Sequence, residues 1–275
     1  MARLLASFFF SHIFIYKHSY KQIKFMEENK FKVPTETIEL PSQGLLYPES
    51  HPLSSGKLEM KYMTAREEDI LTNAAYIKQG TVIDKLLQSL IVTKFDYNDL
   101  LVGDKNSLMI AARVLAYGSN YDITYNGIEQ KVDLSLLNPK PLTEEIKSSK
   151  GANMFNYTLP DSGNVITFKL LTHGDEQKIE AEVKGLKKLN KDSSNEGVVR
   201  LCHMIIAVNG DSETKSVRDF VNNYLLAKEA RAFRQYYTSI SPDIDLTASV
   251  MNSKGEEEDI EVPITINFFW PDARV

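Results

Sequence analysis

The chain has 275 residues, of which 43% are hydrophobic and 25% are charged, and its formal net charge is −5. A chain of this length and composition can bury a substantial core, and it fits one large or two small domains. The acidic balance, with a pI near 5.7, argues against general nucleic-acid binding, which requires a basic surface. Cys202 is the single cysteine, which excludes an internal disulfide and a multi-cysteine zinc site.

The first 25 residues differ in composition from the rest of the chain. Residues 4–16 form a largely apolar run, and the basic residues around it are not balanced by acids. The run is shorter than the ~20 residues that a membrane-spanning helix requires, and no cleavage site of small residues follows it. We expect Met26 to be the natural start and residues 1–25 to be an upstream extension of the reading frame. A membrane-associating anchor and a disordered tail are the alternatives.

A short turn sequence of the form L-P-x-x-G occurs twice, at residues 40–44 and 159–163. In each copy a segment with alternating apolar and polar residues follows, which predicts a half-buried strand. Glycine at the end of such a turn indicates a positive φ angle or a close backbone approach. We therefore expect Gly44 and Gly163 to have positive φ, and replacement of either by valine to be destabilising.

The elements after each strand also follow the same order. Each strand ends at a threonine, Thr64 or Thr172, with acidic residues in the next turn, which is typical of a helix N-cap. An apolar helix is predicted next, then an Asp-containing loop and a second helix, and finally a hairpin. The first hairpin turns at Asn126-Gly127, a strong type I′ signal, and the second turns near residues 254–255.

This repeated order predicts an α+β fold made of two degenerate, topologically similar modules, each a short β-sheet with helices. We place the first module at residues 26–137 and the second at residues 157–275. Residues 138–156, rich in Pro, Ser, Lys and Gly, are interpreted as a linker or an exposed excursion. The polar stretch at residues 184–197 is interpreted as a solvated loop.

Residues with catalytic potential are present, but each has a structural interpretation. His173 lies beside two acids in a predicted first helical turn, where the acids complement the helix dipole. Cys202 and His203 point in different directions on a helix, and the acids at residues 66–69 and 256–259 fit a helix start and a hairpin rim. The chain lacks a glycine-rich phosphate loop, G-x-S-x-G and H-E-x-x-H. We therefore assign no catalytic, cofactor-binding or metal-ligating residue, and we expect an interaction protein.

Several stretches together resemble one phage family. They are residues 39–48 (ELPSQGLLYP), 63–71 (MTAREEDIL), 80–91, 108–123 and 159–172. The chain from residue 26 to about residue 270 resembles the baseplate hub and hub-assembly proteins of T-even-type contractile-tailed phages. The family pattern in some relatives has cysteine pairs in the first hairpin. This chain has none there, so no metal site carries over.

The resemblance implies a structural or assembly role among late proteins of virion assembly. The expected partners are other hub or tail proteins, and the expected location is the tail baseplate or, during assembly, the host bacterial cytoplasm. It implies no cofactor, no nucleic acid and no small-molecule substrate, and membrane contact only if residues 1–25 are native. A transient chaperone for the tape-measure protein is the main alternative. A small enzyme with a site assembled from scattered residues, including His173 and His203, is a further one.

Two apolar segments are candidate partner contacts, because aromatic residues dominate interface hot spots. The first is Phe268, Phe269 and Trp270, and its alternative interpretation is the end of a core strand. The second is Leu45, Leu46 and Tyr47 in the proline-containing loop at residues 45–53. For this loop the alternative is that it covers the edge of the core.

Overall fold

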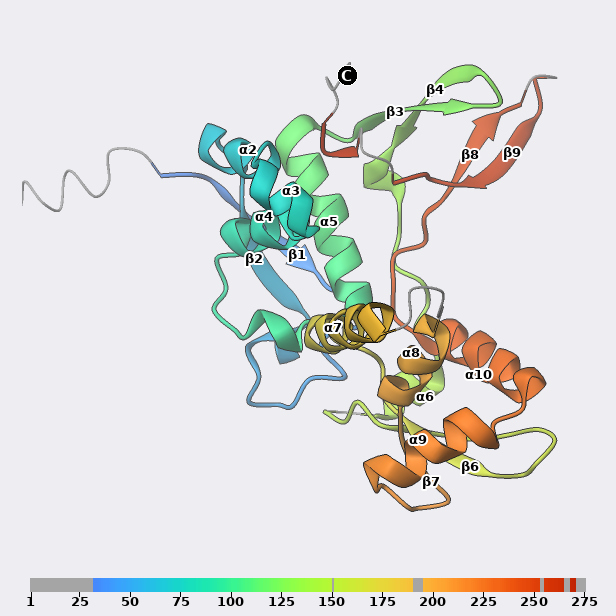
Figure 1. Ribbon diagram of the computed structural model, residues 1–275. Coiled ribbons are helices and arrows are strands. Elements are labelled where there is room, and N and C mark those ends of the chain that lie inside the picture. The colour runs from blue at the N-terminus through green and yellow to red at the C-terminus, as the bar shows by residue number, and fades with distance from the viewer. Residues whose placement is uncertain (1–31, 150, 190–194, 253–254, 265–267, 271–275) are drawn as a thin grey trace, which may run out of the picture. The chain divides into compact units, whose positions relative to one another are not determined.

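The computed structural model describes residues 32–149, 151–189, 195–252, 255–264 and 268–270 (Figure 1). Residues 36–275 form one compact unit, and residues 1–35 are assigned to another. The expectations about Met26 and residues 1–25 lie outside the described residues. No helix in the described part of the chain is long and apolar enough to cross a membrane.

The first half of the unit begins with a two-stranded sheet and ends with a hairpin. Three helices follow the sheet, and a longer helix, α5, precedes the hairpin. The elements are β1 (Thr35–Glu39), β2 (Lys57–Lys61), α2 (Ala65–Leu71), α3 (Ala74–Gln79), α4 (Val82–Leu90), the 3-10 turn η2 (Tyr97–Asp99), α5 (Val102–Tyr117), β3 (Asn120–Tyr125) and β4 (Ile128–Asp133). The hairpin turns at Asn126 and Gly127, both with positive φ, as predicted for a type I′ turn.

The second half begins with a three-stranded sheet, of order β5-β6-β7, and also ends with a hairpin. Its elements are β5 (Phe155–Thr158), β6 (Val165–Phe168), α7 (His173–Leu189), α8 (Glu196–Met204), β7 (Ile205–Val208), α9 (Thr214–Asn223), α10 (Ala227–Ile240), β8 (Thr247–Met251) and β9 (Glu257–Glu261). Small separate sheets among helices confirm the predicted α+β class.

The order of elements in the two halves is similar, although α3 of the first half and α9 of the second have no counterpart. After α4 the chain returns to the first sheet, where Ile91 forms an antiparallel bridge with Met60 of β2. After α8 the chain returns in the same way, and Ile205 of β7 pairs with Phe168 of β6. A two-stranded hairpin then closes each half, after α5 in the first half and after α9 and α10 in the second. The module boundaries at residues 26–137 and 157–275 remain a prediction.

The connecting segment at residues 138–156 is held by the rest of the unit. It contains α6 (Glu144–Ser148), whose Ile146 is fully buried. The Lys140 N–H donates to the Asp243 carbonyl, and the Gly151 N–H donates to the Leu45 carbonyl. The segment therefore connects the halves along a defined path. In the polar stretch predicted as a loop, α7 continues to Leu189, and residues 190–194 lie outside the described residues.

The apolar positions that face the core have the periodicity of their elements. Helix α4 buries Val82, Leu86, Leu87 and Leu90, one stripe of a helix. Strand β2 buries Leu58 and Met60, alternate positions of a strand. In the second half, Phe168 packs edge-to-face on Phe233, with 5.0 Å between ring centroids. The buried side chains of both halves belong to a common hydrophobic cluster.

Candidate functional site

The structure places most of the predicted partner contacts in the core. Phe268 is 0% exposed and Phe269 is 3% exposed. Phe268 packs edge-to-face against Tyr121, with 5.2 Å between ring centroids. Trp270 is half-buried, and its Nε1–H donates to the Leu71 carbonyl at 3.2 Å. The structure therefore favours the core interpretation for the two phenylalanines. The strand proposed to lead into them includes residues 265–267, which lie outside the described residues.

The loop at residues 45–53 covers the core edge in the same way. Leu46 and Tyr47 are buried, and Leu45 is half-buried. The Tyr47 hydroxyl donates to Asp104 Oδ2 at 2.7 Å and accepts from the Leu101 N–H at 3.0 Å. These bonds fix the ring inside the fold. The role of this loop and of the C-terminal aromatic residues as partner contacts stays a prediction. Of their aromatic side chains, Tyr47, Phe268 and Phe269 are buried and Trp270 is half-buried.

The first L-P-x-x-G turn is held by a carboxylate from a helix that comes much later in the chain. The Ser42 N–H donates to Asp104 Oδ1 at 2.9 Å, and the Ser42 hydroxyl donates to Asp104 Oδ2 at 2.7 Å. Asp104 is the third residue of α5 and is fully buried. Burial raises the pKa of Asp104 above the ordinary value, although these hydrogen bonds oppose the shift.

The second turn is held by the corresponding residue of the corresponding helix. The N–H groups of Asp161 and Ser162 donate to Glu229 Oε1, at 3.2 and 2.7 Å. Glu229 is the third residue of α10 and is fully buried. Each half therefore fixes its turn with an acid at the same helical position. The sequence did not lead us to predict a role for either acid. The pattern that could have indicated it is a leucine directly before a predicted helix, followed three residues later by an acid.

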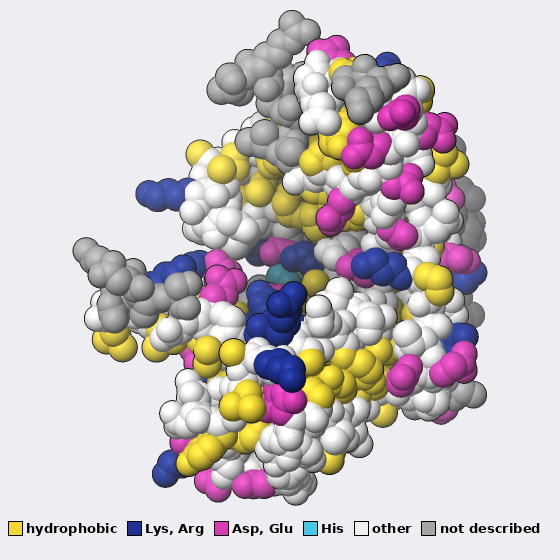
Figure 2. Space-filling model, turned by 90° about the vertical axis from the view of Figure 1, so that its right-hand side faces the viewer, with side chains coloured by type: hydrophobic (Ala, Val, Ile, Leu, Met, Phe, Trp, Pro, Cys, Tyr) yellow, Lys and Arg dark blue, Asp and Glu magenta, His cyan; other side chains and the backbone are white. Residues whose placement is uncertain are grey.

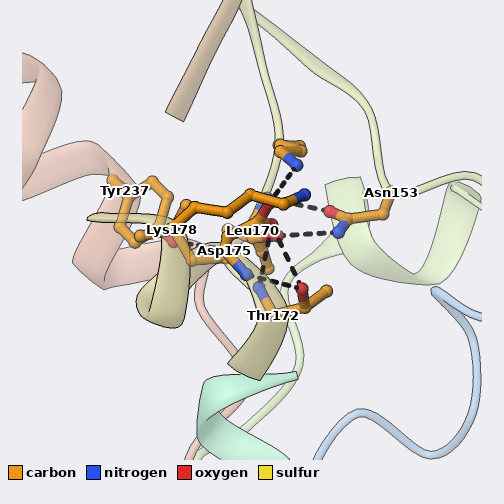
Figure 3. Close-up of polar contacts among 8 residues, drawn as sticks. Asn153, Leu170, Thr172, Asp175, Lys178 and Tyr237 are labelled. Carbon is orange, nitrogen blue, oxygen red and sulfur yellow. Dashed lines mark hydrogen bonds and ion pairs between the residues drawn. The ribbon is translucent and has the colours of Figure 1, made fainter. Parts of the chain in front are cut away.

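The strand-to-helix junctions also match between the halves, and the N-cap predictions for Thr64 and Thr172 are supported. The Thr64 N–H donates to Glu67 Oε2 at 3.1 Å, and the Thr172 N–H donates to Asp175 Oδ2 at 3.2 Å. Figure 3 shows Thr172 and Asp175 together at the start of α7. In each half a lysine of the preceding strand segment forms an ion pair with the capping acid: Lys61 with Glu67, and Lys169 with Asp175.

The capping acid Glu67 gives the fold a defined acid sensitivity. Burial alone would raise the pKa of Glu67, but hydrogen bonds from Lys61, Thr64 and Ser89 outweigh it and lower the pKa from 4.5 to about 2. A depressed carboxylate pKa stabilises the folded state above the unfolded-state pKa, and this contribution is lost as the pH falls through the folded-state value.

We therefore expect the stability of the wild-type chain to fall between pH 4.5 and about pH 2 partly through Glu67. The variant Glu67→Gln should be less stable than wild type at neutral pH, with a smaller further loss over that acidic range. Urea unfolding at a series of pH values measures this difference. Glu68→Gln, at the exposed neighbouring position, is the matched control. Equal pH dependence of wild type and Glu67→Gln would contradict the assignment.

A polar cluster lies where the first half meets α7. Lys105 Nζ is 2.5 Å from Asp84 Oδ1, and the Tyr97 hydroxyl donates to the same oxygen at 3.2 Å. His173 is buried, with its Nε2 3.0 Å from Gln177 Nε2. Burial lowers the pKa of His173, which favours the neutral ring. Asp84, Lys105, His173 and Gln177 line a cavity of about 400 Å³.

The residues considered for an enzyme have separate partners. His203 pairs with Glu182 at 3.0 Å, whereas the contacts of His173 are those of the polar cluster. Burial raises the pKa of the Cys202 thiol, which disfavours the nucleophilic thiolate. In the described ranges, no group of three or more His, Cys, Asp or Glu side chains is placed to hold a metal ion.

The two halves also meet through their backbones. Leu101 forms an antiparallel bridge with Thr172. On either side of the bridge the Val102 N–H donates to the Leu171 carbonyl at 3.1 Å, and the His173 N–H donates to the Leu100 carbonyl at 2.7 Å. This contact joins the start of α5 to the start of α7, which lie next to each other in Figure 1.

A second, mainly apolar cavity of about 320 Å³ lies beside this contact. Its lining includes Leu101, Leu171 and Met204, together with Arg200 and Arg234. On the face in Figure 2, Lys and Arg side chains gather beside a recess, and hydrophobic side chains are exposed around it. Apolar walls with a few polar groups are suited to receiving a side chain or a small apolar group.

A comparison with protein families agrees with the resemblance seen in the sequence. A family model described as T4 bacteriophage base plate protein matches residues 33–270. The match extends through both halves and both hairpins. Comparisons with curated proteins and with solved structures give no match.

Proposed function

Because the chain belongs to the family of T4 bacteriophage base plate proteins, we propose that it acts in the baseplate hub, as a hub subunit or a hub-assembly factor. The observation that carries this proposal is the family match over residues 33–270. The hub role itself is supported by the motifs at residues 39–48, 63–71 and 80–91. In this role the chain works through protein–protein contacts with other hub or tail proteins.

The proposal includes no catalytic step and no cofactor. The buried acids Asp104 and Glu229 accept hydrogen bonds from turn residues within the fold. Among the side chains of the most reactive types, His173 contacts Gln177, His203 contacts Glu182, and Cys202 is partly buried. These observations support a binding protein. The small-enzyme alternative would need a substrate position that touches at least one of these groups.

The chain is located in the tail baseplate of the virion or, during assembly, in the cytoplasm of the infected bacterium. A hub subunit remains in the finished tail, whereas an assembly factor leaves it. A chaperone for the tape-measure protein would leave it too, but would bind that protein rather than the hub. Purified virions and assembly intermediates therefore separate the three roles.

We expect cells infected with phage that lack this chain to accumulate incomplete baseplates without a finished hub. Electron microscopy of the lysate and mass spectrometry of the intermediates measure this. Supplying the full chain from a plasmid should restore complete tails. In purified virions, peptides from residues 33–270 at a fixed ratio to other tail proteins would identify a subunit, and their absence would identify an assembly factor. Normal tails formed without the chain would contradict the proposal.

A further inference from the structure

The contact between the two halves uses one surface from each. The first half contributes residues 100–102 at the start of α5, here called the inner edge. The second half contributes residues 171–173 at the start of α7, here called the inner junction. Their backbones exchange two hydrogen bonds around the bridge between Leu101 and Thr172. The inner edge and the inner junction are different surfaces, so this contact is head-to-tail.

Each of these surfaces has a counterpart in the other half. Leu101 is the N-cap of α5 with φ −61° and ψ 144°, and Leu226 is the N-cap of α10 with φ −64° and ψ 142°. Two capping threonines, Thr64 and Thr172, mark the matching junctions. The counterpart of the inner edge is therefore residues 225–227, the outer edge. The counterpart of the inner junction is residues 63–65, the outer junction.

The outer surfaces are open where the inner surfaces are covered. Leu101 is 5% exposed, whereas its counterpart Leu226 is 53% exposed. Tyr224, directly before the outer edge, is 66% exposed. At the outer junction Ala65 is exposed, whereas its counterpart His173 is buried. One chain thus carries both surfaces that a head-to-tail contact needs, the outer edge and the outer junction. Within the described residues, neither surface is covered by a partner surface.

We propose that the outer edge of one copy binds the outer junction of a second copy, in the register that joins the inner edge to the inner junction. A head-to-tail contact between identical chains leaves one open surface of each kind, so it continues into a ring or an open filament. The inference goes beyond the proposed hub function and does not depend on it, because it rests on contacts and exposures within this chain.

Two sequence differences distinguish the outer surfaces from the inner ones. The inner contact contains Gly174, where an added Cβ would be 2.9 Å from Asn98 Cβ. It also contains Gly103, where an added Cβ would meet the Pro242 carbonyl oxygen. The counterparts are Arg66 and Lys228, so the outer contact cannot reproduce the inner one atom for atom.

The outer surfaces instead provide aromatic partners for these two cations. In an antiparallel register with Leu226 opposite Thr64, Tyr224 falls opposite Arg66, and Tyr62 falls opposite Lys228. A cation placed over the face of an aromatic ring is attracted by the negative face of the ring. Lys228 already pairs with Asp161 at 3.0 Å, but an exposed ion pair of this kind is weak and readily exchanged. In the proposed contact, each cation of one surface therefore has an aromatic residue opposite it on the other surface.

Sedimentation velocity of the full chain over a wide concentration range tests this proposal. The wild type is expected to associate as its concentration rises. Leu226→Arg alters the outer edge at an exposed side chain, and Ala65→Arg alters the outer junction. Each variant alone is expected to remain monomeric. Leu136→Arg, at a position that is 72% exposed and outside both surfaces, is the matched control and should associate like wild type.

An equimolar mixture of Leu226→Arg and Ala65→Arg provides the sharper test. The mixture retains one intact edge and one intact junction, so it should form a dimer of the two variants and no larger species. Far-UV circular dichroism checks that each variant is folded, and Leu226→Ser replaces Leu226→Arg if the latter is not. A monomeric wild type at every concentration would overturn the proposal, as would association that both variants leave intact.

Discussion

Truncation after Pro263 is expected to abolish the cooperative unfolding transition of the chain. The truncation removes Phe268 and Phe269, two aromatic side chains that are almost completely buried. Replacing one buried phenylalanine by alanine costs about 3–5 kcal/mol, whereas an entire domain has a stability of only about 5–15 kcal/mol. Loss of the hydrogen bond from Trp270 to the Leu71 carbonyl adds to the effect. Near-UV circular dichroism and thermal unfolding measure it.

The single variant Phe268→Ala separates the core role of this segment from a partner-binding role. It is expected to lose about 3–5 kcal/mol in urea unfolding, and Phe268→Leu should lose less because most of the volume remains. Leu136→Ala, at an exposed leucine, is the control and should change stability by less than about 0.5 kcal/mol. A truncated chain with wild-type stability that no longer binds its tail partners would instead show that the C-terminal aromatic residues are anchors.

The elements that the sequence predicted are those determined by neighbouring residues. A threonine with an acid three positions later indicates a helix start, and this pattern located α2 at Thr64 and α7 at Thr172. The Asn126-Gly127 turn defined the first hairpin because few other residue pairs adopt the two positive φ angles it needs. The same local signals, found in the same order twice, also predicted the repeated order of the two halves.

The features that the sequence did not predict depend on residues far apart in the chain. Asp104 is 62 positions from Ser42, and no local pattern indicates that the acid accepts hydrogen bonds from that turn. The alternation of apolar and polar residues before Phe268 fits either a core strand or an exposed edge strand. The pattern does not indicate which other residues cover the Phe268 ring. The pairing of Leu101 with Thr172 is of the same kind. It places the outer edge at Leu226, where sequence analysis had found no candidate contact.

Replacement of Gly44 is expected to be far more destabilising than replacement of Gly163, although the two glycines close equivalent turns. Both have the predicted positive φ, +76° at Gly44 and +71° at Gly163. For any other residue this conformation costs about 1–3 kcal/mol. The surroundings differ, however. A Cβ at Gly44 would meet the Ser54 carbonyl oxygen and lie 2.6 Å from the Gly56 nitrogen, whereas a Cβ at Gly163 has no neighbour within 4 Å.

The paired variants Gly44→Ala and Gly163→Ala isolate this steric difference, because each adds the same single carbon atom. Gly163→Ala should lose about 1 kcal/mol from the backbone conformation alone. Gly44→Ala should lose about 3 kcal/mol or more, because backbone atoms of residues 53–56 must also move, and overpacking of this kind costs about 1–3 kcal/mol. The valine variants should follow the same order with larger losses. Urea unfolding measures each value. Equal losses of stability at the two positions would contradict this prediction. They would mean that the backbone around Gly44 moves to accommodate the added carbon atom at no measurable cost in free energy.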